Sequence, residues 1–366
     1  MRILHVFKTY YPLTFGGVEQ VISNLSKHTL KSGNEVSILI CGKKNKEFHH
    51  NGVKVYCCKA NFSISNNPFS ISFIIMLIKM QKNYDILHLH YPFLMNEICF
   101  LLGIFKKPYV ITYHSDVIRG KLIMFAFRVL ANGLLKKAFE TIYTSENYKN
   151  ISYTSAIKCK KSVIPLTLDK RTGEGGRKVE STRINNFKND FVLFIGATRR
   201  YKGLDTLLNA AKISSRTFVV AGDGEEYVRL LRRVRNERIL NVNFLGSVSD
   251  AEKVLLLAKC KLLVLPSNKN SEAFGVVLLE AFKAKKCVIT SDLKTGVTYV
   301  NKHGESGLVF EKNDHKDLNT NIERIFKDNE LYNNLCLGAR KRFDLMFSNK
   351  EVYKYLEIYN NCFQKD

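Results

Sequence analysis

Short apolar runs alternate with amphipathic stretches from the start of the chain. An apolar run at residues 2–7 is followed by a helical pattern at 18–33 and a second apolar run at 35–41. Similar runs recur at 85–90 and 109–114. Continuous apolar runs separated by helical stretches are typical of buried strands in a parallel sheet, so the first half is predicted to be an α/β domain.

The same order of elements begins again in the second half. An apolar run at 191–196 precedes a short loop, a helical pattern at 204–213 and an apolar run at 217–224. Three more runs follow at 241–246, 261–267 and 287–292. The chain is therefore predicted to have an α/β fold of two Rossmann-like, doubly wound parallel-sheet domains.

The boundary between the two domains is marked by a change in composition. Residues 171–190 are polar, contain glycine and show no period, which is typical of a linker. We expect an N-terminal domain at 1–165, a C-terminal domain at 166–347 and a tyrosine-rich helix at 348–366.

Composition adds a strong positive charge to this picture. The 366 residues carry a formal net charge of +24, and residues 1–170 hold 23 Lys and Arg against 9 Asp and Glu, hence +14. Such a field suggests an anionic partner: a nucleic acid, a membrane surface or a phosphorylated substrate. A general coding bias explains the charge equally well, because Lys, Asn, Ile and Phe are abundant throughout.

Cysteine usage and hydropathy indicate a reduced, cytoplasmic protein. The nine cysteines include no C-x-x-C pair, and the apolar start of the chain is too short for a signal-peptide core. The longest apolar run, 71–78, is under half the roughly 20 residues that span a bilayer. The helical pattern at 122–139 fits either an interfacial membrane helix or a buried helix, and we favour the buried helix.

Two glutamates in the second domain are the first candidates for a site. Glu272 and Glu280 are the first and last residues of the segment EAFGVVLLE, which follows an apolar run and a polar loop. With a helix that begins near Phe274, the two carboxylates would lie about 12 Å apart, roughly the reach of a nucleotide-sugar. The helix N-terminus binds anions, so a diphosphate would fit between them. Glutamates that merely flank an amphipathic helix are the alternative.

Cations suited to a diphosphate follow the first strand of the second domain. Arg199, Arg200 and Lys202 lie in the loop GATRRYKG, at the strand end where Rossmann-like sheets bind ligands. The chain contains no G-x-G-x-x-G, no P-loop motif and no Asp-x-Asp pair for a metal-bound diphosphate. We therefore expect no metal and no other cofactor, with protein cations meeting the charge of the leaving group.

Polar residues also follow strands of the first domain. Gly16 and Gly17 come after the first strand, where bare backbone can approach a phosphate. His114 and Asp116, in TYHSD, come at the end of another strand and would face a cleft if the two sheets open toward each other. His88 and His90 alternate with leucines, which favours satisfied structural histidines.

Taken in order, several motifs resemble one enzyme family. GGVEQ, YHSD, GATRRYKGLDTLL, AGDG, FLG, EAFGVVLLEA, TG at 295–296 and GESGLV resemble the retaining glycosyltransferases of family 4, which have the GT-B fold. The likeness is strongest to bacterial mannosyl- and rhamnosyltransferases that build surface polysaccharides, O-antigen and capsule. It implies two Rossmann-like domains facing a cleft, with the helix at 348–366 packing back on the first domain.

The resemblance also implies roles for individual residues. Glu272 would contact the donor sugar and Glu280 the ribose, while Arg199 and Lys202 would bind the diphosphate. Main-chain groups of Ala273, Phe274, Gly275 and Val276 would lie near the sugar and phosphate, and Gly16 and Gly17 would pack close to the diphosphate. His114 would sit beside the anomeric centre. Apart from the resemblance, Asp116 is a candidate acceptor or cleft residue because of its position at the strand end. The chain departs from the family pattern at Thr167, Lys285 and Cys287.

The expected function is metal-independent transfer of a hexose, with retention, from a nucleoside diphosphate sugar to a lipid-linked saccharide. A GDP-sugar of the mannose type is the favoured donor, and a UDP-sugar is the alternative. We expect a cytoplasmic protein, with attachment to the anionic inner face of the cytoplasmic membrane as a further option. A nucleotide-sugar epimerase or phosphorylase is the first rival. A basic nucleic-acid binder is a remote one, because no helix-turn-helix, aromatic RNP pair or zinc finger is present.

Overall fold

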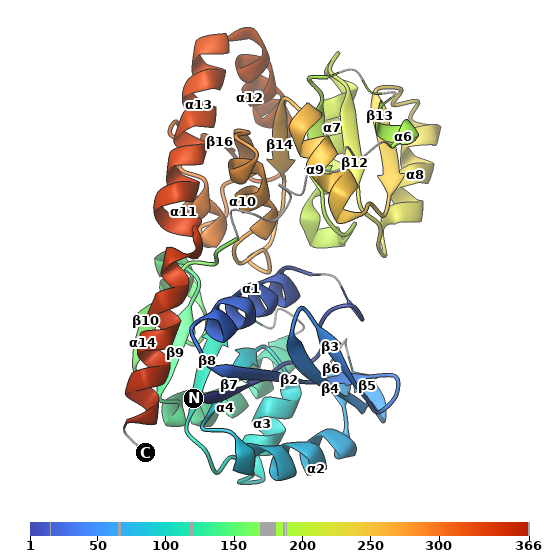
Figure 1. The fold of residues 1–366 in the computed structure, drawn as a ribbon. Coiled ribbons are helices and arrows are strands. Elements are labelled where there is room, and N and C mark those ends of the chain that lie inside the picture. Colours follow the sequence, from blue (N-terminus) through green and yellow to red (C-terminus); the bar gives the residue numbers. More distant parts are fainter. Residues whose placement is uncertain are drawn as a thin grey trace. The chain divides into compact units, whose positions relative to one another are not determined.

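A computed structural model describes residues 1–14, 16–64, 67–116, 121–168, 181–185, 187 and 189–364. The chain divides into two compact units, Met1–Thr167 with Asn349–Asp366, and Leu168–Ser348 (Figure 1). Much of the polar segment at 171–190, where the boundary was predicted, lies outside the described residues.

Unit 1 is built on an eight-stranded sheet with the order β10-β9-β8-β7-β1-β2-β4-β3. Every neighbouring pair is parallel except β3 with β4. The strands are β1 (Arg2–Val6), β2 (Glu35–Gly42), β3 (Lys46–His50), β4 (Val53–Lys59), β7 (Ile86–Tyr91), β8 (Tyr109–Tyr113), β9 (Glu140–Tyr143) and β10 (Lys161–Val163). A small antiparallel pair, β5 (Phe62–Ile64) and β6 (Asn67–Phe69), lies outside this sheet.

The helices of unit 1 connect these strands and cover the sheet. They are α1 (Gly17–Lys31), α2 (Ile71–Met80), η1 (Gln81–Asn83), α3 (Leu94–Leu101), α4 (Lys121–Lys137), α5 (Glu146–Ile151), η4 (Asn349–Glu351) and α14 (Val352–Phe363). The side chains at 122–127, part of the helix with two interpretations, lie outside the described set. In the described remainder Ala131, Leu134 and Leu135 are buried, as a buried helix requires.

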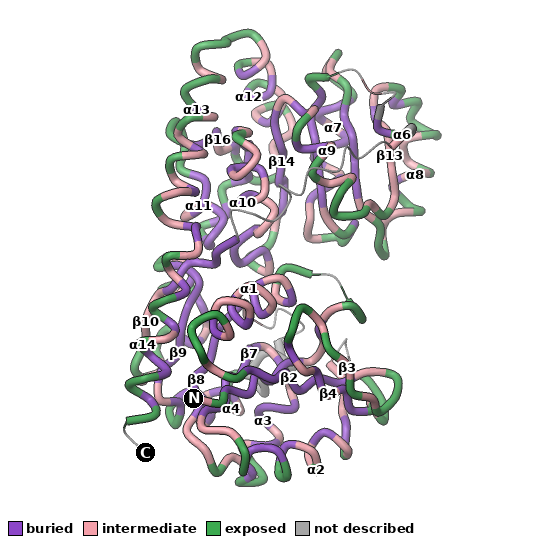
Figure 2. The backbone as a smooth tube through the Cα atoms, in the orientation of Figure 1, coloured by how far each residue is buried: buried purple, intermediate pink, exposed green. Residues whose placement is uncertain are grey.

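The last helix, α14, is part of unit 1 although it follows unit 2 in sequence. Its residues Val352, Tyr355, Ile358 and Tyr359 share one apolar cluster with residues of the central strands and α1. Polar bonds add to this contact: the hydroxyl of Tyr359 lies 2.6 Å from Nδ1 of His88 in β7. The strands that α14 contacts, β7 and β8, are buried along their whole length (Figure 2). The C-terminal helix is thus fixed by both apolar packing and hydrogen bonds to the sheet.

Unit 2 contains a six-stranded, wholly parallel sheet with the order β13-β12-β11-β14-β15-β16. The strands are β11 (Val192–Ile195), β12 (Phe218–Ala221), β13 (Val242–Gly246), β14 (Leu262–Leu265), β15 (Val288–Ser291) and β16 (Gly307–Phe310). This is the doubly wound order 3-2-1-4-5-6, in which the direction of winding reverses between β11 and β14. Ligands of such sheets bind outside the carboxyl ends of the strands at this switch point.

Helices of unit 2 lie on both faces of its sheet. They are α6 (Thr182–Asn185), η2 (Arg200–Lys202), α7 (Leu204–Lys212), α8 (Tyr227–Asn236), α9 (Asp250–Lys259), α10 (Val276–Lys283), α11 (Gly296–Val300), α12 (His315–Lys327), α13 (Asn329–Arg342) and η3 (Phe343–Phe347). One continuous apolar cluster joins α7, α8, α12 and α13 to the strands. The prediction of two parallel α/β sheets is confirmed.

A buried glutamate in unit 1 makes folding depend on pH. Glu97 of α3 is fully buried, and neither carboxylate oxygen has a hydrogen-bond partner in the described part of the chain. Burial raises the pKa of this carboxyl to about 8. The folded protein therefore holds a proton on Glu97 at neutral pH, whereas the unfolded chain loses it near its ordinary pKa of about 4.3.

Replacement by glutamine should remove this dependence. Because the folded pKa is raised, the contribution of Glu97 to stability is greatest below about pH 4.3 and falls by about 1.4 kcal/mol per pH unit up to the folded pKa. The free energy of unfolding of Glu97→Gln should thus gain on wild type between pH 5 and 8, as measured by urea denaturation. Exposed Glu35 supplies the control Glu35→Gln. A difference between Glu97→Gln and wild type that stays constant with pH would contradict this assignment.

Candidate active site

A buried ion pair joins the two loops at the switch point of unit 2. Lys202, in the loop after β11, places Nζ 2.5 Å from Oε2 of Glu272, in the loop after β14. The two side chains are only 13% and 8% exposed. Burial alone would lower the pKa of the Lys202 ammonium, but the adjacent Glu272 carboxylate outweighs burial and leaves this pKa raised. Lys202 is therefore a fixed, charged cation at neutral pH.

Gly203 allows the loop of Lys202 to reach the end of β14. It has a φ of +68°, and a Cβ atom there would lie 1.9 Å from the carbonyl oxygen of Pro266. Both the left-handed backbone and the close approach exclude a side chain. Since Pro266 follows β14 directly, this glycine brings Lys202 to Glu272.

The position of Glu272 is fixed by its surroundings. Oγ of Ser267 donates a hydrogen bond of 2.8 Å to Oε2, the same oxygen that pairs with Lys202. The hydroxyl of Thr295 donates to the Glu272 carbonyl at 2.8 Å, and the Gly296 amide donates to the Ala273 carbonyl at 2.8 Å. Ser267 and Thr295 were not predicted as site residues: Ser267 has only its position at the end of a strand-like run as a signal, and Thr295 was noted only as part of the TG motif at 295–296.

Helix α10 begins directly behind this carboxylate. It starts at Val276 rather than near Phe274, because Gly275 adopts a left-handed conformation with a φ of +76° and acts as the N-cap. A Cβ atom at Gly275 would lie 2.8 Å from Leu265, so no other residue fits without a shift. The first amides of the helix follow at Val276, which places anion-binding groups next to Glu272.

Glu280 has a different environment from Glu272. It lies on α10 and forms an ion pair of 2.8 Å with Lys253 of α9. Burial alone would lower the pKa of Lys253, but Glu280 and Asp250 together outweigh burial and raise it. This pairing was not predicted, because Lys253 lies in another helix and carries no motif. A carboxylate has about four acceptor positions, so the bond to Lys253 alone does not prevent Glu280 from accepting a hydroxyl group.

The remaining predicted residues of unit 2 lie around the same loops. Arg199 is exposed and precedes η2. Its positive charge acts to lower the pKa of Lys202, against the net shift. Phe274 is buried, with its ring centroid 6.0 Å from that of Phe347. Unit 2 thus brings Arg199, Lys202 and Glu272 together near the start of α10.

The three departures from the family pattern have local explanations. Lys285 has a φ of +58°, a conformation that suits the glycine usual there. Cys287 is buried in the core of unit 2. Thr167 accepts a 2.9 Å hydrogen bond at its hydroxyl from the Asn24 amide, so its side chain ties the end of unit 1 to α1.

Gly16 and Gly17 lie at the start of α1 in unit 1. Both are exposed, and Gly16 is the N-cap of the helix. A Cβ atom at Gly16 would lie 2.5 Å from the Glu19 carboxylate, which also accepts a 2.8 Å hydrogen bond from Thr14. Glu19 is thus an acidic neighbour of the two glycines, and it was not predicted as a site residue.

His114 follows β8 and is buried. Its Nε2 lies 3.0 Å from Nδ1 of His90, while its Nδ1 is buried without a hydrogen-bond partner in the described chain. Burial lowers the pKa of His114 to about 3, with the positive charge of Lys8 acting in the same direction. The imidazole is therefore neutral at physiological pH.

Asp116 is bonded within unit 1. Its carboxylate accepts a 2.7 Å hydrogen bond from the Tyr113 hydroxyl, and its amide donates to the Tyr148 hydroxyl at 2.7 Å. Burial raises the pKa of this carboxyl, against the opposite effect of the Tyr113 bond. Asp116 shares strand end β8 with His114.

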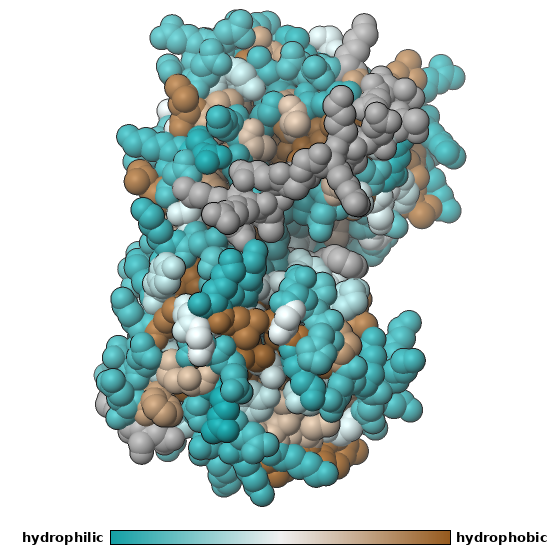
Figure 3. Space-filling model, viewed as in Figure 1, coloured by the Kyte–Doolittle hydropathy of each residue, from teal (hydrophilic) through white to brown (hydrophobic). Residues whose placement is uncertain are grey.

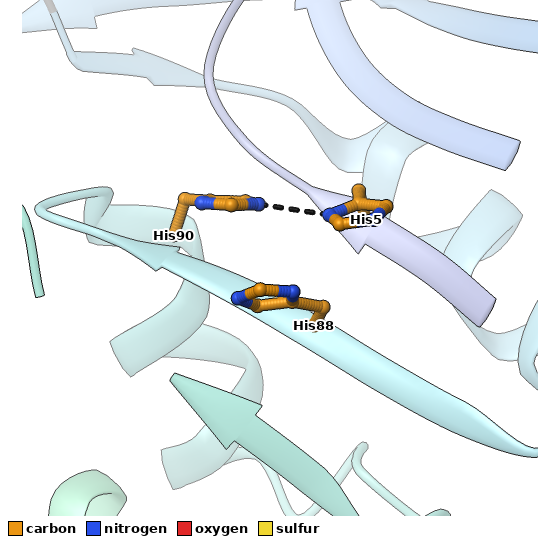
Figure 4. Close-up of side chains that lie close together, drawn as sticks. All are labelled: His5, His88 and His90. Carbon is orange, nitrogen blue, oxygen red and sulfur yellow. Dashed lines mark hydrogen bonds between the residues drawn. The ribbon is translucent and has the colours of Figure 1, made fainter. Parts of the chain in front are cut away.

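Three buried histidines, His5, His88 and His90, lie close enough together to suggest a metal site (Figure 4). The arrangement does not suit a metal. His88 uses Nδ1 and Nε2 for Tyr359 and Thr112, and His90 uses both nitrogens for His5 and His114. The rings of His88 and His90 stack with centroids 4.3 Å apart, so their in-plane lone pairs do not converge. The expectation of satisfied histidines at 88 and 90 fits these contacts.

Two parallel α/β sheets with polar loops at the carboxyl ends of their strands define the GT-B class of glycosyltransferase folds. Sucrose-phosphate synthase from Thermosynechococcus elongatus is similar over 100% of both chains, with a TM-score of 0.83 and 18% identity. Anabaena Alr3699/HepE, solved in complex with UDP-glucose, has a TM-score of 0.76 over 98% of this chain and 99% of its own, at 18% identity.

Sequence comparisons give the family. Residues 15–169 match Glycosyltransferase Family 4 and residues 178–342 match Glycosyl transferases group 1. The O-antigen chain mannosyltransferase C of Escherichia coli is 31% identical over 100% of this chain and 99% of its own. D-rhamnosyltransferase WbpZ of Pseudomonas aeruginosa is 34% identical, covering 84% of this chain and 82% of that protein. The chain belongs to the group 1 glycosyltransferases, glycosyltransferase family 4.

The ion pair predicts how variants of unit 2 unfold. Lys202→Met leaves the Glu272 carboxylate buried without its cation, which should lower the free energy of unfolding by about 3 kcal/mol. Glu272→Gln should lower the free energy of unfolding by a similar amount, because it leaves the Lys202 ammonium buried without its carboxylate. In Lys202→Met/Glu272→Gln no unpaired charge remains, so the double variant should regain most of the loss in chemical denaturation. Losses that simply add in the double variant would contradict a tightly coupled pair.

Proposed function

We propose that this protein is a retaining hexosyltransferase that acts in the synthesis of a cell-surface polysaccharide. It would move a hexose from a nucleoside diphosphate sugar to a hydroxyl of a lipid-linked saccharide. The buried Lys202–Glu272 pair at the switch point of unit 2 is the observation that carries this proposal. It offers a fixed cation for a phosphate and a fixed carboxylate for a sugar at the place where such sheets bind ligands.

The roles of the residues of unit 2 follow from charge and hydrogen-bonding capacity. Lys202 and exposed Arg199 would bind the diphosphate, together with main-chain groups from Ala273 to Val276. Glu272 uses Oε2 for Lys202 and Ser267, which leaves Oε1 outside these two bonds for a sugar hydroxyl. Glu280 would accept a ribose hydroxyl beside Lys253. Unit 2 would thus be the donor-binding domain.

Unit 1 would serve the acceptor side. Gly16 and Gly17 would pack close to the diphosphate, His114 would lie beside the anomeric centre, and Asp116 would contribute to the acceptor region. The neutral state of His114 supports a hydrogen-bonding role for it at physiological pH.

Electrostatic stabilisation of the leaving diphosphate would supply most of the catalysis. Negative charge builds on the diphosphate as the glycosidic bond breaks, and Lys202, Arg199 and the α10 amides would stabilise it. Glu272 is held in an ion pair, which suits a hydrogen-bond acceptor better than a covalent nucleophile. We therefore propose front-face attack, in which a donor phosphate oxygen takes the acceptor proton. No metal takes part in this mechanism.

The donor is proposed to be a mannose-type GDP-sugar. The names of the two relatives, a mannosyltransferase and a D-rhamnosyltransferase, support this sugar class. A UDP-sugar is the second candidate, because HepE was solved with UDP-glucose.

Loss of the Lys202 charge should lower turnover in the folded enzyme as well as stability. In assays with EDTA present, Lys202→Ala should lower kcat by about a hundredfold, the usual scale for one charge-stabilising donor. Wild type should transfer from GDP-mannose faster than from UDP-glucose. Lys212→Ala, which removes a lysine paired with Glu237 on the surface of the same unit, is the matched control and should keep wild-type kcat.

Three outcomes would count against the mechanism. A wild-type rate in Lys202→Ala would remove its assigned role. Activity that is lost in EDTA and restored by Mg²⁺ would show that a metal, and not protein cations alone, stabilises the diphosphate. An isomerised sugar formed without acceptor would favour an epimerase.

We also propose that unit 1 docks on the anionic inner face of the cytoplasmic membrane. Ile71, Ile75 and Ile78 are about half exposed and recur at helical spacing on one face of α2. Exposed Lys79 and Lys82 follow on the same segment. Figure 3 shows apolar surface over this part of unit 1. Apolar side chains with adjacent lysines suit an interfacial contact with acidic lipids.

This surface is distinct from a membrane span. Among the residues that the structure describes, no helix combines the length and apolar content needed to cross a bilayer. An acceptor linked to lipid would then be met at the surface on which unit 1 is docked.

Vesicle binding tests the α2 surface. Wild type should bind vesicles with acidic lipid more strongly than neutral ones at low salt, and Ile75→Glu should weaken that binding at least tenfold by placing a carboxylate in the contact. Leu240→Glu is the control, since Leu240 is 92% exposed in unit 2. Equal binding to acidic and neutral vesicles, or an unaffected Ile75→Glu variant, would contradict docking through α2.

A further inference from the structure

Three buried imidazoles form a continuous hydrogen-bonded chain that runs across neighbouring strands of the unit 1 sheet. Nδ1 of His5 lies 2.9 Å from Nε2 of His90, and Nδ1 of His90 lies 3.0 Å from Nε2 of His114. Figure 4 shows the bond from His5 to His90, with His88 stacked beside it. The chain starts in β1, crosses to β7 and ends beyond β8, so it spans the switch point of this sheet.

The two ends of the chain are unpaired. Nε2 of His5 and Nδ1 of His114 are buried, and neither has a hydrogen-bond partner in the described ranges. Burial lowers the pKa of His5 and of His114 to about 3, and that of His90 well below its ordinary value. All three rings are therefore neutral, and each carries one N–H.

One N–H on each ring allows only two arrangements with both bonds intact. In the first, His5 donates to His90, His90 donates to His114, and His114 carries its hydrogen on Nδ1. In the second every direction is reversed, and the unpaired N–H is Nε2–H of His5. The tautomer of His114 is thus coupled to that of His5, a residue it does not contact.

The cost of the unpaired N–H separates the two arrangements. His5 lies within β1 and is fully buried, so an N–H at its Nε2 cannot meet a ligand. His114 lies at the strand end with 6% exposure, so this end is the one that a bound substrate can approach, although Nδ1 itself is covered in the free protein. A buried donor without an acceptor is strongly disfavoured, and only in the first arrangement can a substrate oxygen supply that acceptor.

We propose that His5 and His90 are positioning residues that hold His114 in the Nδ1–H tautomer, as a hydrogen-bond donor to an acceptor oxygen of the substrate. This inference rests on the proposed function for the identity of that substrate, a nucleoside diphosphate sugar. It defines the role of His114 more closely: the side chain orients a sugar or phosphate oxygen and does not act as a general base.

The tautomer can be measured by spectroscopy with GDP-mannose bound, since its oxygens are the proposed acceptors. Nitrogen-15 NMR of histidine-labelled protein, with His114 assigned by His114→Gln, should show Nδ1 protonated and Nε2 bare in the wild-type protein. His90→Phe should lose this preference, and His90→Asn should keep it, because its amide replaces Nδ1 of His90 toward His114. His88→Gln is the matched control. His88 is equally buried, but it bonds to Tyr359 and Thr112 and to none of the three hydrogen-bonded histidines, so the His114 signals should remain.

Kinetics give a second readout. His90→Phe should lower kcat/KM by about five- to tenfold, the scale of one neutral hydrogen bond, while His90→Asn stays within about twofold of wild type. A wild-type His114 protonated on Nε2, or an Nδ1–H signal that persists in His90→Phe, would overturn the inference. The wild-type spectrum alone decides the tautomer, even where a variant fails to fold. If nucleotide-sugars neither bind nor react but the Nδ1–H tautomer is found, the proposed function fails and the histidine chain stands.

Discussion

The pairing of Lys202 with Glu272 is the interaction on which unit 2 depends. Taking two charges out of water costs several kcal/mol per ion, so the pair must be short and well supplied with hydrogen bonds. The surrounding residues meet that demand. Gly203 lets the Lys202 loop touch β14, Ser267 adds a second bond to Glu272, and Thr295 holds the backbone of Glu272 in place. The result is a cation and a carboxylate fixed beside the start of α10 before any ligand binds.

Both units place their polar groups at the same topological position. In unit 2 the ion pair bridges the loops after β11 and β14, and in unit 1 the histidine chain begins in β1 and β7. Doubly wound sheets reverse their winding at these strands. Polar residues inside a sheet are costly unless they are bonded, and Tyr355 and Tyr359 of α14 complete the network around Thr112 and His88. The C-terminal helix is therefore a structural part of unit 1.

Apolar periodicity was enough to predict two parallel α/β sheets, because buried strands require continuous apolar runs. The residues in the loops after β11 and β14 were also found from motif and strand position. Partners distant in sequence were not: Lys253 pairs with Glu280 across 27 positions, and His88 meets Tyr359 across 271. The start of α10 was misplaced by two residues, because Gly275 is the N-cap of the helix in a left-handed conformation, beside Leu265, where a side chain would not fit. No sequence motif at His90 distinguishes a histidine that positions another residue from one with a purely structural role.

Binding of nucleoside phosphates tests the central claim, that protein groups alone hold the diphosphate. Isothermal titration calorimetry with GDP and GMP, in EDTA, isolates the contribution of the β-phosphate from that of the nucleoside. Wild type should bind GDP more tightly than GMP by at least tenfold, and Lys202→Met should lose most of that difference while its affinity for GMP changes little. Equal affinities for GDP and GMP in wild type, or a GDP preference that appears only when Mg²⁺ is added, would contradict the account.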